Sequence, residues 1–182
     1  MNINIENLGC DSNEADTARL RAFFKENGHK LSSAEEAEVH VLMSCGFNQD
    51  KLEENETRLK DLRKHGGKII LGGCVPKIAP ELKSLADKHF GPREWDKVDE
   101  LFLAKKSIHS FSSSFDRNKK RIIRVATGCR GACSYCAIKK ATGSVKSRTV
   151  KELRSEIHQG LREGVESFVL VGEDVGAWGQ DI

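Results

Sequence analysis

Three cysteines spaced C-x3-C-x2-C constrain this chain more than any other feature of its sequence. They are Cys129, Cys133 and Cys136, and they come shortly after the apolar run 122–126. Thiolates this close together can bind one metal centre, but a cubic 4Fe-4S cluster with full protein ligation needs four cysteines. No cysteine follows Cys136. The motif therefore predicts a cluster with three protein ligands and one open iron.

Zinc, a redox pair and a chance spacing are the alternatives to a cluster. A structural zinc site usually has four ligands, so a distant histidine such as His109 or His158 would have to complete it. Disulfides are disfavoured, because residues 1–10 hold neither the basic stretch nor the long apolar stretch of a secretory signal. The compartment is therefore expected to be reducing.

Positive charge is concentrated in one part of the chain. The segment from Arg117 to Arg154, called the basic segment below, holds twelve Lys or Arg and one acid, Glu152. Outside it lie 18 of the 30 basic and 26 of the 27 acidic residues. This asymmetry indicates an anionic partner for the basic segment, unless its charges only solvate a surface or offset the cluster thiolates. No apolar run approaches a membrane span, so no membrane partner is expected.

Apolar periodicity predicts strands that alternate with helices in the first part of the chain. We expect strands at residues 2–8, 39–43 and 68–71, and helices from Asp11 to Gly28, from Lys51 to His65 and from Pro80 onward. Asp11 and Glu14 have the spacing of a capping box. Helices of this length serve as crossovers between parallel strands, so the order βαβαβ predicts a parallel sheet.

The three remaining cysteines each follow one of these strands directly. They are Cys10, Cys45 and Cys74, and a glycine adjoins each of them. Because the carboxyl ends of parallel strands share one edge of a sheet, we expect the three thiols to meet there. Taken singly, each cysteine could instead be a small buried apolar residue.

The second part of the chain repeats the same pattern on a smaller scale. A helix at 95–105 and a serine-rich linker at 107–120 precede a strand at 122–126, a helix at 150–163 and a strand at 167–171. With the boundary near Asp116, we expect an N-terminal domain at 1–116 and a second α/β unit at 117–182. An α/β barrel needs about 200 residues or more, so the second unit is interpreted as the start of a barrel.

The cysteines and their flanking residues resemble those of the radical-SAM methylthiotransferase family over nearly the whole chain. The motifs that carry the resemblance are Gly9-Cys10, Ser44-Cys45, Gly73-Cys74, the triple-cysteine loop and the run from Val171 to Asp181. The resemblance implies two 4Fe-4S clusters, one held by Cys10, Cys45 and Cys74, the other by Cys129, Cys133 and Cys136.

The resemblance also implies where S-adenosylmethionine binds. Tyr135 is the aromatic residue of the cluster motif, and Gly172 and Glu173 end the second barrel strand, where the methionine amino group is held in this family. In α/β barrels, the residues of the active site lie at the C-terminal ends of the strands. The alternative for Glu173 is an ordinary solvated loop acid.

By resemblance, the activity is transfer of a methylthio group to a modified adenosine beside the tRNA anticodon, with the basic segment on the tRNA. The resemblance also implies a cytoplasmic location and a partner that donates electrons to the clusters. The run from Gly172 to Gly179 looks more like the threonylcarbamoyl-adenosine branch than the isopentenyl-adenosine branch. The 182-residue form alone is expected to be inactive, because two barrel strands cannot shield a radical from water.

Three alternatives remain open at this point. One is methylthiolation of a ribosomal-protein aspartate, the second is a non-catalytic cluster or zinc protein that binds nucleic acid, and the third is a radical-SAM enzyme without sulfur transfer. Two departures from the family pattern bear on the substrate. Met43-Ser44-Cys45 stands where the family has Asn-Thr-Cys, and Thr142-Gly143 stands where it has Arg-Gly.

Overall fold

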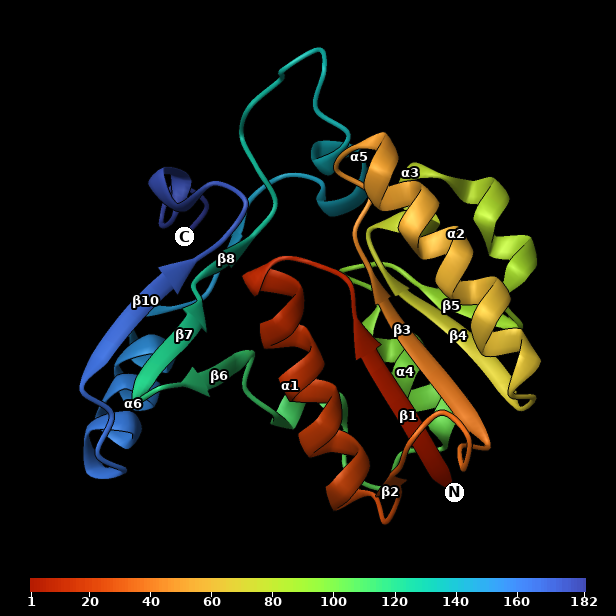
Figure 1. Cartoon of the computed structure of the whole chain (residues 1–182). Coiled ribbons are helices and arrows are strands. Elements are labelled where there is room, and N and C mark those ends of the chain that lie inside the picture. Colours follow the sequence, from red (N-terminus) through yellow and green to blue (C-terminus); the bar gives the residue numbers. More distant parts are fainter.

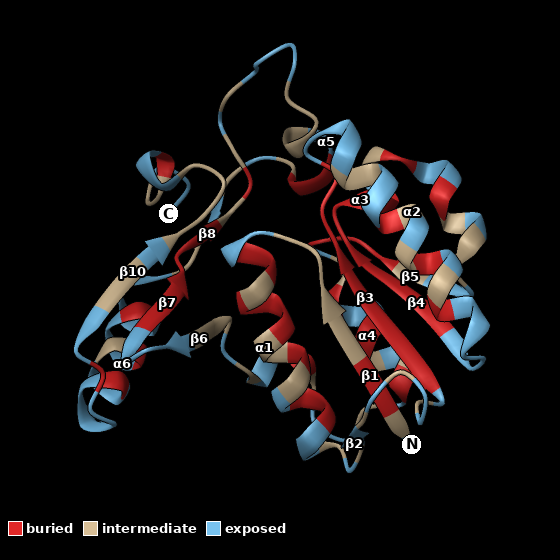
Figure 2. Cartoon of the chain, viewed as in Figure 1, coloured by how far each residue is buried: buried red, intermediate tan, exposed pale blue.

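A five-stranded parallel sheet in the order β2-β1-β3-β4-β5 forms the first unit of the chain (Figure 1). The structure is a computed structural model and describes residues 1–182. The strands are β1 (Asn2–Asn7), β2 (Lys30–Leu31), β3 (Val39–Ser44), β4 (Lys68–Gly73) and β5 (Lys88–Phe90). All six residues of the central strand β3 are buried, which is typical of a parallel strand covered on both faces (Figure 2).

Helices cover both faces of this sheet. They are α1 (Asp11–Glu26), α2 (Gln49–Lys64), α3 (Val75–Ile78), η1 (Pro80–Leu85), α4 (Trp95–Phe102) and η2 (Ile108–Ser110). On one face, Phe23 and Phe24 of α1 pack with α4 against Val41 of β3. On the other, Leu59 of α2 packs against Leu42, the next residue of β3. Successive side chains of a strand point to opposite faces of the sheet. Val41 and Leu42 therefore enter two separate cores.

The second unit is built on a three-stranded sheet in the order β10-β7-β6. Its elements are β6 (Ser114–Arg117), β7 (Lys120–Arg124), β8 (Ala126–Thr127), α5 (Ile138–Thr142), β9 (Lys146–Ser147), α6 (Val150–Arg162), β10 (Ser167–Val171) and η3 (Val175–Ala177). β7 and β10 are parallel and α6 connects them, packing Leu153 on Ile123. β8 and β9 form a small antiparallel pair. β10 lies at the edge of its sheet.

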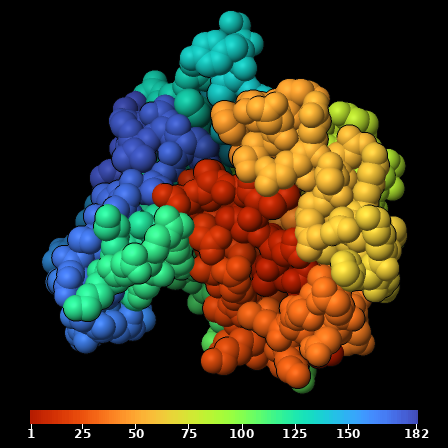
Figure 3. Space-filling view, viewed as in Figure 1, coloured from red at the N-terminus to blue at the C-terminus, as the bar shows by residue number.

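The two units meet mainly through α1, which packs against β6 and β7, while α3 contacts α5 (Figure 1). Figure 3 shows the atoms of α1, in red, directly against those of β6 and β7, in green. At this junction Arg124 of β7 donates to Asp16 of α1. Arg93, which precedes α4, donates to the carbonyl of Thr127, 2.7 Å away. None of the helices is both long and apolar enough to span a membrane.

The parallel sheet predicted for the first unit is confirmed, and so is the parallel β7-α6-β10 order. The capping box at Asp11 and Glu14 is wrong. Cys10 is the N-cap residue without a side-chain hydrogen bond, and Glu14 instead accepts from Asn7 and Arg21.

The linker predicted at 107–120 is also wrong. It contains η2 and β6, and β6 pairs antiparallel with β7. The serine-rich composition of this segment gave no sign of a strand, although β6 pairs with β7 and packs against α1. The domain boundary after residue 116 stays a prediction, and β6 extends across it. The helix expected from Pro80 is a 3-10 helix, and α4 ends at Phe102, where Leu103 adopts a left-handed conformation.

Candidate functional site: two cysteine loops at strand ends

Cys10, Cys45 and Cys74 lie at the carboxyl edge of the first sheet. Cys45 directly follows β3, Cys74 directly follows β4 and precedes α3, and Cys10 lies between β1 and α1. Cys45 and Cys74 are buried and Cys10 is exposed. Because β1, β3 and β4 are neighbouring parallel strands, the expectation that the three cysteines share one sheet edge agrees with this topology.

Gly73 allows the ends of β3 and β4 to come close together. Its φ is +90°, and a Cβ there would lie 2.5 Å from the carbonyl oxygen of Ser44. The amide of Cys74 donates to that same carbonyl, with an N–O distance of 3.0 Å. Asn13 of α1 adds a side-chain donor to it at 2.8 Å. Hydrogen bonds to this one carbonyl group thus hold the ends of β3 and β4 and the first turn of α1 together.

The thiols of this edge influence one another electrostatically. Burial, with the added repulsion of Cys45 and Cys10, raises the pKa of the Cys74 thiol to about 12. Burial also raises the pKa of the Cys45 thiol, and Cys10 again adds repulsion. Three thiolates cannot coexist here without a compensating positive centre. Metal coordination would supply that compensation, since a coordinating thiol is deprotonated by the metal.

No three His, Cys, Asp or Glu side chains are arranged to hold a single metal ion. The donor set nevertheless fits an iron-sulfur cluster in kind, because soft cysteine sulfurs are its characteristic ligands and oxygen ligands are not. A cubane presents its irons at separate corners, so its three cysteines do not have to converge on one point.

Cys129, Cys133 and Cys136 lie in the loop between β8 and α5. The amide of Gly131 donates to the sulfur of Cys129 at 3.1 Å. A Cβ on Gly131 would lie 3.2 Å from that sulfur and 3.7 Å from the sulfur of Cys133, so both sulfurs flank the same glycine. The amide of Cys136 donates to the carbonyl of Cys133 at 3.1 Å and closes a turn. Tyr135 is 89% exposed.

Glu173 connects the end of β10 to this loop. Its carboxylate accepts from the amide of Gly128 at 2.7 Å and from Arg124 at 3.2 Å, and its side chain is only 11% exposed. Glu173 is therefore not a solvated loop acid. Gly172 lies beside the backbone of β8, where a Cβ would be 3.1 Å from the carbonyl oxygen of Ala126. Asp174 accepts from the amide of Arg130 at 3.1 Å.

Comparison with known proteins places these loops in context. A family model described as "Uncharacterized protein family UPF0004" matches residues 2–90. The whole chain is 31% identical to a probable threonylcarbamoyladenosine tRNA methylthiotransferase of Archaeoglobus fulgidus and 30% identical to the ribosomal protein uS12 methylthiotransferase RimO of Thermosipho africanus. Over 98% of the chain, it is 28% identical to the mouse threonylcarbamoyladenosine tRNA methylthiotransferase.

The chain belongs to the radical-SAM methylthiotransferase family. It spans 46% of the length of the Archaeoglobus and Thermosipho relatives and 35% of the mouse methylthiotransferase. The match to the family model covers the first cysteine set, and the matches to the relatives cover both sets.

The sequence did not reveal the residues at the junction of the two units, and Arg124 counted there only as part of the basic segment. Arg124 is 4% exposed and Arg121 is 8% exposed, so neither belongs to the solvent-exposed part of the basic segment. Burial opposes the charge of Arg124, but the carboxylates of Asp16 and Glu173 outweigh it and raise the pKa of the guanidinium. The available signal was Arg124 inside the otherwise apolar run 122–126, which points to a buried partner.

Proposed function

We propose that this protein is a methylthiotransferase that adds a methylthio group to a modified adenosine beside the tRNA anticodon. The observation that carries the proposal is the pair of cysteine sets, one at three neighbouring strand ends and one in the loop after β8. The names of the Archaeoglobus and mouse relatives support the substrate class. A cytoplasmic location and an external electron donor form part of the same proposal.

Each cysteine set has its own role in this proposal. Cys10, Cys45 and Cys74 would hold one 4Fe-4S cluster, and Cys129, Cys133 and Cys136 the other. Together with S-adenosylmethionine, the clusters would supply electron transfer, radical chemistry and the transferred sulfur. The β7-α6-β10 unit would be the first part of a radical-SAM barrel.

The residues around the second set organise its loop. Glu173 fixes the backbone of Gly128, the residue before Cys129, and Asp174 fixes the backbone of Arg130, the residue after it. Both carboxylates follow β10 directly, so the end of that strand determines the path of the cysteine loop. Gly172 and Glu173 would in addition line the site of the cofactor's methionine group, and Tyr135 would cover the cluster from the solvent side.

A ribosomal-protein substrate is the second candidate, and one observation favours it. The RimO relative is 30% identical over the same 100% of the chain, almost as similar as the Archaeoglobus tRNA enzyme. Basic charge discriminates poorly between them, because ribosomal proteins are themselves surrounded by RNA. Mass spectrometry of tRNA nucleosides and of ribosomal proteins, from cells with and without the gene, separates the two. Loss of methylthiolation on a ribosomal protein alone would refute the tRNA assignment.

Anaerobic reconstitution of the chain tests the clusters themselves. We expect about eight irons per chain for two 4Fe-4S clusters. Replacing either set of three cysteines by alanine should remove about half of the iron. Tyr135→Phe, which keeps all six thiols, is the matched control and should leave the iron content unchanged. Full iron content after loss of Cys10, Cys45 and Cys74 would refute the two-cluster proposal.

A further inference from the structure

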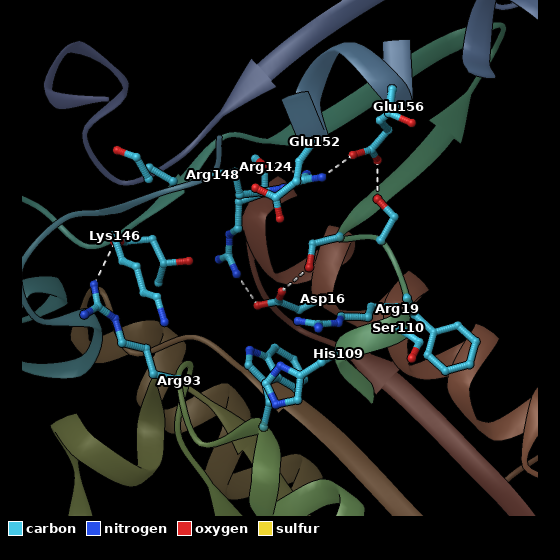
Figure 4. A pocket seen from close by; sticks show the side chains of 18 of the residues that line it. Asp16, Arg19, Arg93, His109, Ser110, Arg124, Lys146, Arg148, Glu152 and Glu156 are labelled. Atoms are coloured by element: carbon cyan, nitrogen blue, oxygen red, sulfur yellow. Dashed lines mark hydrogen bonds and ion pairs between the residues drawn. The ribbon is translucent and has the colours of Figure 1, made fainter. Parts of the chain in front are cut away.

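A polar cleft of about 900 Å³ separates the two units along part of their junction (Figure 4). The cations that line it come from both units, among them Arg19 and Arg93 from the first and Arg124 and Arg148 from the second. Units that are separated by a cleft share less packed surface there. The few side chains that reach across the junction therefore have a large effect on how the units are placed, and Arg93 is one of these side chains.

Arg93 closes the base of the loop that carries the second cysteine set, residues 128–143, called the second cysteine loop below. One nitrogen of its guanidinium donates to the carbonyl of Thr127, 2.7 Å away, and also to the carbonyl of Ser144. Thr127 directly precedes this loop and Ser144 directly follows it. Figure 4 shows the Arg93 guanidinium directed toward the strand that carries Lys146, β9. A side chain of the first unit thus ties together the two ends of a loop of the second.

The base of the second cysteine loop is shaped to admit this guanidinium. Gly128 has a φ of +95°, and a Cβ there would overlap both Arg93 and the carbonyl of Ser144. Within the second unit, the base is closed by the β8-β9 pair and by the amide of Cys129, which donates to the carbonyl of Gly143 at 3.1 Å. Hydrogen bonds from a charged donor are stronger than neutral ones, so loss of Arg93 should favour an open base.

A tight turn presents Arg93 to the second cysteine loop. In the turn at residues 91–94, the amide of Glu94 donates to the carbonyl of Gly91 at 3.1 Å, and the Glu94 carboxylate accepts from the amide of Gly91 at 2.8 Å. Pro92 occupies the second position, where its fixed φ suits a turn. Arg93 is the third residue of this turn, so its backbone is fixed independently of the loop that its side chain contacts.

The residue beside Arg93 contacts the helix that follows the first cysteine set. Glu94 accepts from Lys77 of α3 at 2.5 Å, and α3 begins directly after Cys74. Glu94 also accepts from Lys97 of α4 at 2.9 Å. Two consecutive residues therefore reach the surroundings of both cysteine sets, Glu94 on the side of the first set and Arg93 on the side of the second.

We propose that Arg93 is a positioning residue for the second cysteine set, so that the first unit completes a cluster site whose thiols all belong to the second unit. A site of this kind depends on surrounding hydrogen bonds that hold its ligands in place. The proposal rests on the proposed function in one respect, because it takes this cysteine set to hold a cluster. Beyond that function, it makes cluster binding in the second unit depend on a side chain of the first.

Amide hydrogen exchange of the metal-free chain, followed by NMR, tests the closed base directly. The Cys129 amide is protected by its hydrogen bond to Gly143, so its exchange rate reports how often the base opens. Arg93→Met should raise this rate about tenfold, as expected for the loss of one charge-assisted hydrogen bond. The Cys74 amide, which donates to Ser44, should keep its parent rate. The melting temperature should fall by no more than about 4 °C.

Lys140→Met is the matched control for this exchange experiment. Lys140 is also an exposed cation that reaches a carbonyl across the junction, that of Ile78 at 3.5 Å, but it does not tie the loop ends together. The Cys129 amide should therefore exchange at the parent rate. Arg93→Lys keeps one nitrogen donor, which is all that the two carbonyls use, so the rate should return to within about threefold of the parent. Equal acceleration by Lys140→Met, or a lysine variant no better than Arg93→Met, would overturn the proposal.

The release of cluster iron to a ferrous chelator, after anaerobic reconstitution, is the second readout. When Cys10, Cys45 and Cys74 are alanine, only the second set remains, and Arg93→Met should then speed iron release about tenfold. When the second set is alanine instead, Arg93→Met should have no effect. Iron release at the parent rate in the first background would overturn the proposal. If neither background bound iron, the clusters of the proposed function would be refuted, and amide exchange would still decide whether Arg93 closes the loop.

Discussion

Arg124 of β7 and Asp16 of α1 form an ion pair that is almost fully buried between the two units of the chain. The same guanidinium reaches Glu173 at 3.2 Å, and Glu173 in turn holds the loop of the second cysteine set through Gly128. Asp16 lies in the helix that begins directly after Cys10. One arginine therefore connects the helix behind the first set to the loop of the second.

Loss of this arginine should destabilise the chain strongly. Arg124→Met leaves the carboxylate of Asp16 buried without a counter-ion, which costs about 3 to 5 kcal/mol in the free energy of unfolding. Urea unfolding measures it. Arg117→Met is the matched control, because Arg117 pairs with Asp11 across the same junction but both side chains are exposed. Its cost should stay below about 1 kcal/mol.

The double variant Arg124→Met with Asp16→Leu separates charge burial from packing. It removes both charges of the pair, so most of the lost stability should return. A double variant as unstable as Arg124→Met alone would show that the guanidinium contributes through its shape and its contact with Glu173 rather than through Asp16.

Gly73→Ala should destabilise the edge that carries the first cysteine set. The new Cβ would lie 2.5 Å from the carbonyl oxygen of Ser44, so β3 and β4 must move apart. Gly66→Ala is the control, since Gly66 has a similar φ of +79° but no atom within 4 Å of its Cβ position. We expect about 1 kcal/mol for Gly66→Ala from backbone strain. Gly73→Ala should cost at least about 2 kcal/mol more, measured by urea unfolding.

The ionisation of Glu94 should make the free energy of unfolding depend on pH. Burial alone would raise the pKa of its carboxyl, but Lys77, the amide of Gly91 and Lys97 outweigh it and lower the pKa to about 2. A lowered folded-state pKa stabilises the fold above the unfolded value of 4.5, and this contribution is lost as the pH falls toward 2. Allowing for solvent screening, we expect Glu94→Gln to cost about 1 to 2 kcal/mol at pH 7.

The comparison of Glu94→Gln with the parent chain across pH completes this test. The difference in unfolding free energy should shrink between about pH 4.5 and 2, because the parent carboxyl becomes neutral there. A difference that stays constant from pH 7 to pH 3 would show that Glu94 acts through packing and hydrogen bonds that do not depend on its charge.

Thr149→Ala should weaken the start of α6. The hydroxyl of Thr149 accepts from the amide of Glu152, and the Glu152 carboxylate accepts from the amide of Thr149 at 2.7 Å. Loss of such a cap costs about 1 kcal/mol. Val150→Ala, at the next and exposed position, should change the stability by less than about 0.5 kcal/mol. Thermal unfolding of both variants provides the comparison.

The sequence predicted the central strands well because their burial is encoded locally. β3 and β4 are apolar along nearly their whole length and are bounded by glycine and cysteine, so period, length and end signals agree. The edge strand β2 gave no such signal, because both of its residues are exposed and it is held by backbone pairing to β1. β6 was hidden by its short length and its serine-rich flank, although it packs against α1.

The cysteine positions could be predicted, but the junction could not. Strand ends fix the edge on which Cys10, Cys45 and Cys74 lie, and topology alone supplies that information. The partner of Arg124 is 108 residues away in sequence, and no local pattern specifies which acid a buried arginine will meet. The cleft was missed for the same reason, since its cations come from both units.

The edge position of β10 has a consequence for the handling of the protein. β10 pairs with β7 on one side only, and its five residues, Ser-Phe-Val-Leu-Val, include no charge and no proline. Leu170 is 47% exposed. Charged residues and prolines are what normally prevent an open edge from accepting a foreign strand. Concentrated solutions of the chain should therefore aggregate through β10, and a lysine at position 170 should delay turbidity more than any change in ionic strength.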